Sequence, residues 1–505
     1  MTATVRALPT PSASITSEWL EEWATTLRHS VRPNSATVYL RSVRQFLAFL
    51  DEHHPGVTTV AEVKREHVEG WMAHLTEQGM APATRSVRLK ALSRFFTYVD
   101  EQEDTGNPVD KVARPTVHAP RVEIPPDEVI RGLLTLTDGK GYVDVFTGGR
   151  RPSAHHTPGW VTLLGVVSRL GFRSEVDHQV FTAALGLVLV VLIAVLARSL
   201  FGDATGIVAA FVAALYPGFW VLEAQLWAET FALVVLVVMT LQLYALRRRA
   251  TLGGVALAGL IAGVGTLVRP ELLVVPLVVL PVILVRCARL PWQKLVASGA
   301  VFLGLTAVVV APWIVYNAGK FEEPVLLSTN FGSTMLAGNC VFEGPDVGFW
   351  VLDCNRQVGL ANPGVDRSQF DRLSRSAALD NVRDNLSAMP VVLVARVGRT
   401  LGVWDPVGTV QAVARAQQVR AWPVALWVGA FWAMLPLAVV GGVAARRRGT
   451  WLLPLLAPFV AVVVVVLVFF GEPRYHALAD PAVVVLAAFG GVCLLRRTRL
   501  ERFVR

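Results

Sequence analysis

The stretch that decides the fold is residues 180–198, which read VFTAALGLVLVVLIAVLAR. No charged side chain precedes the last residue, Arg198, and polar and apolar residues do not alternate along the run. A helix needs ~20 apolar residues to cross a hydrocarbon core ~30 Å thick, whereas the strands of a membrane β-barrel alternate. The stretch therefore predicts a membrane-spanning α-helix.

Further runs of the same kind follow, in a first block at residues 180–315 and a second block at residues 422–495. Helices formed by the shorter runs would lie closer to the bilayer normal than the longer ones, or the bilayer would be thinner around them. We expect an all-α chain whose larger part is a polytopic domain with about nine membrane spans. Such a chain is a multi-pass protein of the cell membrane, and the lipid bilayer is one of its partners. The further runs are 206–222, 230–246, 253–268, 272–285, 295–315, 422–445, 451–471 and 481–495.

The composition changes sharply along the chain. Of the 505 residues, 53% are hydrophobic and 17% are charged, which favours the membrane class. Residues 1–140 nevertheless contain no run long enough to span a bilayer, and residues 1–14 are predicted to be a disordered tail without a signal peptide.

The sequence also argues against two classes of protein. Four cysteines in the whole chain are too few for a fold held together by disulfides. Few charges within the spans and no repeated halves argue against a transporter.

Clusters of basic residues predict which helix ends face the cytoplasm, because loops on that side are enriched in Lys and Arg. Placing every cluster inside leaves residues 223–229, 269–271, 316–421 and 472–480 outside. Residues 141–179 also fall outside, yet no span carries the chain across before them, so a span is expected to be missing there. The clusters lie at 247–249, at Arg286, Arg289 and Lys294, at 446–448, and in the tail 496–505.

Two cysteines, Cys340 and Cys354, fall in the long outer segment 316–421, where oxidising conditions would permit a disulfide. Free thiols are an equal alternative for this pair. The other two cysteines, Cys287 and Cys493, fall on the reducing side of the predicted membrane.

Residues 15–112 predict a soluble four-helix bundle with helices over 15–28, 35–49, 63–78 and 84–99, because apolar residues recur there at helical spacing and polar turns separate the runs. Two of these helices carry rows of cations. The rows predict a surface that faces nucleic-acid phosphates; an ordinary solvated face is the alternative. The cations are Arg41, Arg44, Arg85, Arg88, Lys90 and Arg94.

Two segments of this bundle, Ser35-Ala-Thr-Val-Tyr-Leu-Arg-Ser-Val-Arg-Gln-Phe and Pro82-Ala-Thr-Arg-Ser-Val-Arg-Leu-Lys-Ala-Leu-Ser-Arg-Phe-Phe, resemble the SAM-like core-binding domain of tyrosine recombinases (phage integrases). The resemblance implies a module that clamps DNA. Residues 113–140 resemble the linker and the start of the recombinase catalytic domain. The catalytic set of that family is not found after Lys140, so the resemblance implies DNA binding without cleavage.

From residue 141 the chain resembles a different family. Leu215-Tyr-Pro-Gly-Phe-Trp, Leu267-Val-Arg-Pro-Glu, Ala311-Pro-Trp-Ile-Val-Tyr-Asn and Ala395-Arg-Val-Gly-Arg, in this order, resemble actinobacterial GT-C membrane glycosyltransferases of the family 39 type. The resemblance covers about 141–490. It implies sugar transfer from a polyprenyl-phosphate donor on the extracytoplasmic face.

The first span of that family, and the acidic motif that supplies its catalytic carboxylate, should precede residue 141, where the recombinase-like segment stands instead. We therefore expect a fusion whose glycosyltransferase part is truncated and inactive. The alternative is a membrane-tethered DNA-binding protein, which requires residues 15–112 to lie in the cytoplasm.

Transfer from a lipid phosphate needs a carboxylate to activate the acceptor and cations to hold the departing phosphate. Glu229 is the predicted catalytic carboxylate, and electrostatic support of a helix N-terminus is the alternative. Arg269 and Arg474 are predicted to bind the donor phosphate, with snorkelling to the interface as the alternative.

A second pair of cations, Arg396 and Arg399, lies in a predicted interfacial helix over 391–404 and would suit the donor phosphate or lipid headgroups. His155 and His156 are adjacent histidines without carboxylate partners, so no metal site is predicted from them. The sequence leaves open whether a divalent metal assists a polyprenyl-phosphate sugar donor.

Overall fold

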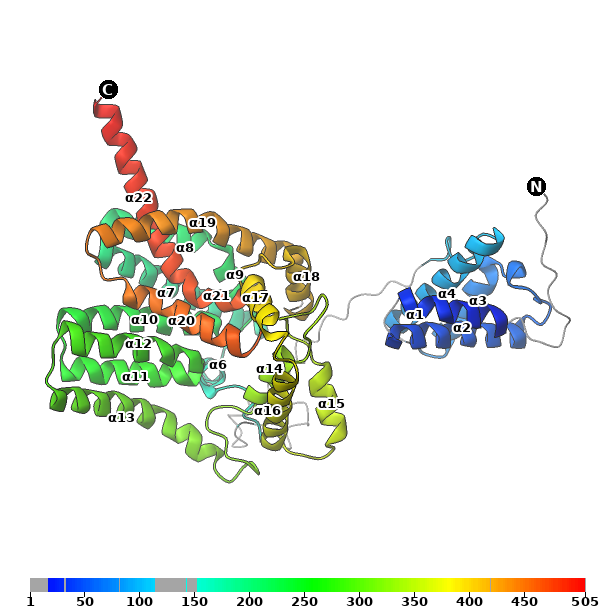
Figure 1. The fold of residues 1–505 in the computed structure, drawn as a ribbon, viewed down its shortest axis with the longest axis horizontal. Coiled ribbons are helices and arrows are strands. Elements are labelled where there is room, and N and C mark those ends of the chain that lie inside the picture. Colours follow the sequence, from blue (N-terminus) through cyan, green and yellow to red (C-terminus); the bar gives the residue numbers. More distant parts are fainter. Residues whose placement is uncertain are drawn as a thin grey trace. The chain divides into compact units, whose positions relative to one another are not determined.

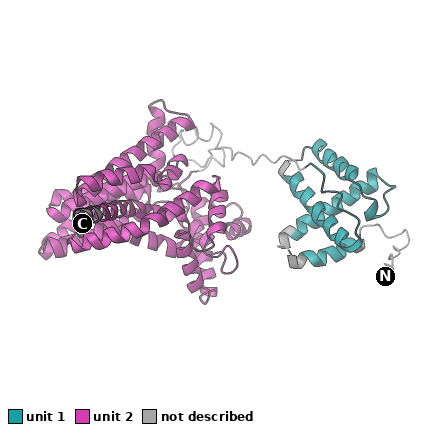
Figure 2. Cartoon of the chain, turned by 90° about the horizontal axis from the view of Figure 1, so that it is seen from above, with its two compact units in different colours: residues 1–124 teal, residues 125–505 magenta. Residues whose placement is uncertain are grey.

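The computed structural model describes residues 17–30, 33–80, 82–113, 142, 152–417 and 419–504. The chain divides into two compact units, residues 1–124 and 125–505 (Figure 2). Within the described residues the regular structure is helical and contains no strand, so the all-α prediction is confirmed. The predicted tail 1–14 and nearly all of the predicted linker 113–140 lie outside the described residues.

Unit 1 is a small helical bundle around an aromatic core, as predicted. Trp71 packs edge-on against Phe46 with ring centroids 5.3 Å apart, and Phe95 does the same with Trp23 at 5.3 Å. These rings come from all four helices and are buried, so the bundle has a hydrophobic core of its own. The helices are α1 (Ser17–Ser30), α2 (Pro33–His53), α3 (Arg65–Glu77) and α4 (Pro82–Glu103), with a 3₁₀ turn η1 (Val60–Glu62) before α3.

Unit 2 is a bundle of long apolar helices with a group of short helices at one end (Figure 1). Its first part is α6 (Pro158–Arg169), α7 (Glu175–Phe201), α8 (Asp203–Leu215), α9 (Pro217–Ala224), α10 (Glu229–Arg248), α11 (Leu252–Val268), η4 (Pro270–Leu273), α12 (Val274–Val282), the π-helix η5 (Ile283–Cys287) and α13 (Trp292–Asn317). The short helices are α14 (Phe331–Gly338), α15 (Asp353–Ala361), α16 (Arg367–Asp384), α17 (Met389–Thr400) and α18 (Pro406–Gln417). The chain ends with α19 (Ala421–Arg447), α20 (Leu453–Val468), α21 (Pro473–His476), η6 (Ala477–Ala479) and α22 (Asp480–Val504).

The number of spans is lower than the nine predicted. Among the described residues, six helices are long and apolar enough to cross a membrane, and the pair α8–α9, bent by 49°, would make a seventh. The two remaining predicted spans are α11 and α20, with 17 and 16 residues. At about 1.5 Å per residue such helices reach only about 24–26 Å. For α20 the predicted run, residues 451–471, was longer than the helix because its ends, such as residues 469–471, leave the helical conformation. For α11 the predicted run and the helix agree to within one residue.

The helix ends group as the charge pattern predicts. The guanidinium of Arg247 lies 5.1 Å from the ring centroid of Trp451, and the hydroxyl of Tyr244 donates to the Trp451 carbonyl at 2.9 Å. The basic turn after α10 and the basic turn before α20 therefore share one end of unit 2. At the other end, the start of α10 meets the end of α11 through an ion pair between Glu229 and Arg269.

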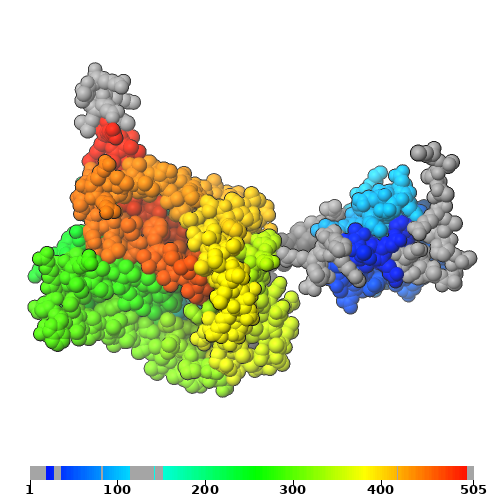
Figure 3. Space-filling view, viewed as in Figure 1, coloured from blue at the N-terminus to red at the C-terminus, as the bar shows by residue number. Residues whose placement is uncertain are grey.

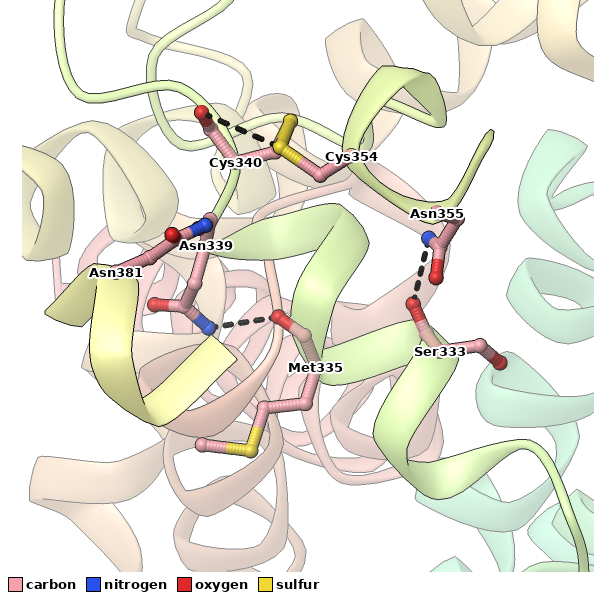
Figure 4. The surroundings of a disulfide bond; sticks show 7 residues. All are labelled: Ser333, Met335, Asn339, Cys340, Cys354, Asn355 and Asn381. Carbon is pink, nitrogen blue, oxygen red and sulfur yellow. Dashed lines mark hydrogen bonds between the residues drawn. A yellow bond between two sulfur atoms is a disulfide. The ribbon is translucent and has the colours of Figure 1, made fainter. Parts of the chain in front are cut away.

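The short helices α14–α18 form a cap, the yellow-green to amber surface at one end of unit 2 in Figure 3. Its loop between α14 and α15 is closed by a disulfide between Cys340 and Cys354 (Figure 4). Amide side chains surround this bond: Asn381 donates to the carbonyl of Asn339 at 2.9 Å, and Asn355 donates to the carbonyl of Ser333 at 2.9 Å. Together they attach α14, α15 and α16 to one another.

A buried arginine, Arg396, fastens this cap to the membrane helices, and a second one, Arg399, joins parts of the cap to one another. Arg396 is 0% exposed and donates to the carbonyl of Leu467 at 2.7 Å, to that of Gly338 at 3.1 Å and to Oδ1 of Asn339 at 2.7 Å. It thereby joins α17 to the end of α20 and the end of α14. Burial lowers the pKa of its guanidinium to about 10, still well above neutrality.

Arg399 has the same kind of surroundings. It is 2% exposed and donates to the Val347 carbonyl at 2.8 Å, to the Thr409 hydroxyl at 2.9 Å and to the Pro345 carbonyl. Both arginines of α17 therefore point inward, and the exposed valines of α17, Val391 and Val394, point outward. These hydrogen bonds indicate that Arg396 and Arg399 fasten the cap, although the buried Nε of Arg396 has no hydrogen-bond partner. Binding of the donor phosphate by these two arginines stays a prediction.

Replacing Arg396 with Leu should destabilise unit 2 strongly. The substitution leaves two buried carbonyls and one amide oxygen without their charged donor, at a cost of about 1.5–3 kcal/mol for each such bond. The midpoint of thermal unfolding in detergent should fall by far more than for Arg415→Leu, whose side chain on α18 is exposed. Equal midpoints for the two variants would contradict the fastening role.

Candidate functional site

Three helix ends converge at the end of unit 2 that carries the cap. Glu229 is the first residue of α10, and Arg269 stands between α11 and η4 in an extended conformation, with φ −147° and ψ 114°. Arg269 has this extended backbone because Pro270 follows it, and a proline disfavours helical backbone angles in the residue before it. The helix therefore ends there, and the side chain of Arg269 is directed toward the start of α10.

Arg269 is held by two carboxylates. Its Nη1 pairs with Oε1 of Glu229, and its Nε donates to Oε1 of Glu271 at 2.5 Å. The side chain is 19% exposed. Desolvation acts to lower the pKa of Arg269, but the neighbouring charges of Glu271 and Glu229 outweigh it and raise that pKa. The guanidinium is thus a permanent cation at this site.

Arg474 comes from the short helix α21 and approaches the same place. Its guanidinium carbon lies 4.9 Å from the ring centroid of Trp227 and 5.6 Å from that of Tyr475. Its Nε is 3.3 Å from Oε2 of Glu472, but the geometry makes no hydrogen bond, and this buried nitrogen has no hydrogen-bond partner. The side chain as a whole is 26% exposed.

A small cavity joins these groups. Its volume of about 10 Å³ holds roughly one water molecule. One carboxylate and two guanidinium groups face apolar and aromatic side chains there, so few protein groups compete for an anion that enters. The lining residues are Glu229, Leu233, Arg269, Arg474, Tyr475, Ala477 and Leu478.

The pKa values of two groups at the edge of the site, Glu472 and His156, are shifted by their surroundings. Glu472 accepts a hydrogen bond from Gln417, and burial raises its pKa although Arg474 opposes the shift. The side chain of His156 reaches the surface, yet desolvation and then the charges of His155, Arg474 and Arg269 lower its pKa to about 4. At neutral pH His156 therefore adds no positive charge to the site.

The structure brings together three of the residues predicted from the sequence, Glu229, Arg269 and Arg474. Arg396 and Arg399 do not line the cavity that these three residues share, although the helix that carries both, α17, packs against α21. Sequence reasoning did not single out Trp227, Tyr475 or Glu472 as members of the site; Glu472 and Tyr475 flank Arg474 in the chain, which was the available signal. No group of three or more histidine, cysteine or acidic side chains that could hold a metal occurs in the part of the chain that the structure describes.

In unit 1, the predicted basic surface is partly assembled. Arg41 and Arg44 line an open groove on α2, and the pKa of Arg88 on α4 is lowered by desolvation and then by the charge of Arg41. These three arginines are neighbours across two helices. Lys90 is exposed, whereas Arg85 donates to the hydroxyl of Thr76 and Arg94 lies over the Tyr39 ring at 5.6 Å.

Comparison with known families assigns each unit separately. Residues 19–104 match the model of the phage integrase N-terminal SAM-like domain. Residues 155–316 match the model described as dolichyl-phosphate-mannose-protein mannosyltransferase. No curated protein and no solved structure gives a significant match.

The second match includes Glu229, Arg269 and Glu271, and it ends before the cap and before Arg474. The apolar helices of unit 2 agree with a multi-pass membrane protein, as both the charge pattern and this family imply. The chain therefore joins a phage integrase N-terminal SAM-like domain, residues 19–104, to a region of the dolichyl-phosphate-mannose-protein mannosyltransferase family, residues 155–316.

Proposed function

We propose that unit 2 is a GT-C type glycosyltransferase domain of the cell membrane that binds the phosphate of a polyprenyl-phosphate-linked sugar at Arg474 and Arg269. The observation that carries the proposal is the buried Nε of Arg474, which lacks a hydrogen-bond partner beside a cavity shared with Arg269. A phosphate oxygen would supply the missing acceptor, and charge-assisted bonds of this kind are strong.

The charge balance supports Arg474 as the group that the donor phosphate would meet first. Two arginines face three carboxylates, Glu229, Glu271 and Glu472, so the fully ionised cluster carries 2 − 3 = −1. Because the pKa of Glu472 is raised, protonation of this carboxyl would remove the excess negative charge. Arg269 has two carboxylate partners already. Among the described residues, Arg474 has one carboxylate partner, Glu472, at a distance and angle that leave its Nε without a hydrogen bond.

The same cavity argues against efficient transfer. Among the described residues that line it, Glu229 is the sole carboxylate, and Arg269 holds one of its oxygens. The resemblance places the catalytic carboxylate in a motif before residue 141, where this chain has the integrase-like segment. We propose that the chain binds the lipid-linked donor and transfers little or no sugar.

Replacing Arg474 with Gln should weaken binding of a polyprenyl monophosphate. The loss of one charge-assisted contact, about 1.5–3 kcal/mol, corresponds to a dissociation constant higher by about tenfold or more. The dissociation constant is measured by calorimetry, as farnesyl monophosphate binds to the full chain in detergent. Arg415→Gln removes an exposed arginine of the cap and should bind like the unmodified chain. Unchanged affinity of Arg474→Gln would refute the donor-binding proposal.

The purified chain should transfer no sugar above background from a polyprenyl-phosphate sugar, because Glu229, the one carboxylate among the described residues that line the cavity, is held by Arg269. Radiolabelled donor in proteoliposomes, with label counted in the acceptor fraction, measures this. Glu229→Gln should abolish any residual transfer. Robust transfer that survives this substitution would contradict both the proposed inactivity and the assignment of Glu229.

A second function is supported for unit 1. Arg41, Arg44 and Arg88 gather on one face, and none of them forms an ion pair within the described part of the unit. Uncompensated neighbouring cations repel one another, and a phosphate backbone would relieve that repulsion. We propose that this face binds duplex DNA, provided that unit 1 lies in the cytoplasm.

The double variant Arg41→Gln, Arg44→Gln should bind duplex DNA more weakly and with less dependence on salt. Removing two phosphate contacts lowers the slope of log K against log salt by about 1.8. Fluorescence anisotropy of a labelled duplex with the full chain in detergent measures it. The matched control is Lys64→Gln, Arg65→Gln, which removes two exposed cations at the start of α3. Equal slopes, or an extracytoplasmic location of unit 1 in protease protection, would exclude this function.

A further inference from the structure

A buried carboxylate, Asp480, lies one helical turn beyond α21 and outside the cavity of the proposed site. It is 0% exposed. Its Oδ2 accepts from the Tyr216 hydroxyl at 2.9 Å and from Nε1 of Trp427 at 3.2 Å, and its Oδ1 is 2.8 Å from Nδ1 of His476. Trp427 Nε1 also lies 3.1 Å from the Tyr216 hydroxyl. These four residues are called the Asp480 network below.

The Asp480 network joins the places where two membrane segments are interrupted. Tyr216 stands at the break between α8 and α9, and Asp480 follows η6 at the start of α22. Trp427, from α19, fits between Tyr216 and Asp480 because Gly218 has no side chain. A Cβ atom on residue 218 would lie only 2.3 Å from Nε1 of Trp427. Residues far apart in the chain are thus held at one point.

No cation neutralises Asp480 among the described residues unless His476 is protonated. A carboxylate in such a place depends on its hydrogen-bond donors, and losing them is costly. Phe431 stacks on the His476 ring with centroids 4.1 Å apart, and Nε2 of His476 is buried without a partner. The imidazole is therefore held by Asp480 on one edge and by aromatic packing on its face.

This geometry bears directly on Arg474. His476 is the last residue of the four-residue helix α21, and Arg474 belongs to the same helix. Tyr475 lies between them and lines the cavity. A shift of His476 therefore moves the backbone that carries Arg474, and with it the guanidinium group that lies over the Trp227 ring.

We propose that Tyr216, Trp427 and Asp480 are positioning residues that hold α21, through His476, so that Arg474 faces the donor phosphate. The proposal rests on the proposed binding of a lipid phosphate at Arg474. It assigns a role at the site to three residues outside the cavity, two of them in α19 and α22, beyond the region matched by the family model.

The test is a double-mutant cycle on farnesyl monophosphate binding to the full chain in detergent. Tyr216→Phe removes one donor from Asp480 and should raise the dissociation constant by about fivefold to tenfold. In the Arg474→Gln background, the same change should have almost no effect, because the residue through which it acts is gone. Farnesol, which lacks the phosphate, should bind all variants equally.

Tyr244→Phe is the matched control. It removes a buried tyrosine hydroxyl that bonds to the Trp451 carbonyl at the opposite end of the helices. It should lower thermal stability about as much as Tyr216→Phe does and leave phosphate binding unchanged. Asp480→Asn, if it folds, should weaken binding at least as much as Tyr216→Phe; if it does not fold, Tyr216→Phe alone decides.

Three results would overturn the proposal. The first is unchanged binding by Tyr216→Phe. The second is a loss of equal size with and without Arg474, which would show that the network acts on stability or on some other group. The third is equal weakening by Tyr244→Phe. If Arg474→Gln itself binds normally, the proposed function fails first; if only the Tyr216 effect is missing, the proposed function stands and the positioning role does not.

Discussion

The pairing of Arg269 with Glu229 and Glu271 is the interaction on which the functional end of unit 2 depends. A guanidinium at the end of an apolar helix is costly to bury unless carboxylates neutralise it. Here one partner opens α10 and the other lies in η4, so neutralising one charge also fixes where three helical segments begin and end. The cavity exists because these ends meet there.

The same requirement explains how the rest of unit 2 is joined. In a lipid environment, contacts between apolar side chains hardly distinguish one partner helix from another. An interrupted helix, in contrast, leaves backbone polar groups without their helical hydrogen bonds, and these groups need particular partners. Arg396 satisfies the carbonyl of Leu467 near the end of α20, and Asp480 meets the hydroxyl at the break between α8 and α9. The cap and the broken helices are thus connected through a few buried polar contacts.

The two units depend on different physical principles. Unit 1 buries aromatic side chains in a compact bundle and leaves cations such as Arg41, Arg44 and Lys90 exposed, as a soluble domain does. Unit 2 exposes valine and leucine along its long helices, which suits lipid rather than water. The family matches divide the chain in the same way, at 19–104 and 155–316. Nothing in either core requires the other, which agrees with a fusion of two unrelated domains.

The sequence by itself determined the class of each unit, because apolar run length and helical periodicity are local properties that survive without tertiary contacts. It also singled out Glu229, Arg269 and Arg474, since charges beside apolar runs are conspicuous. Tertiary structure decided the rest. Arg396 and Arg399 also lie beside an apolar run, and the structure shows that they donate to backbone carbonyls of residues 338–347 and of α20; no local pattern predicts such distant acceptors. The number of span-length helices depends likewise on where each helix ends. The convergence of Tyr216, Trp427 and His476 on Asp480 depends on packing between distant segments, since Tyr216 lies 264 residues before Asp480 and Trp427 lies 53 residues before it.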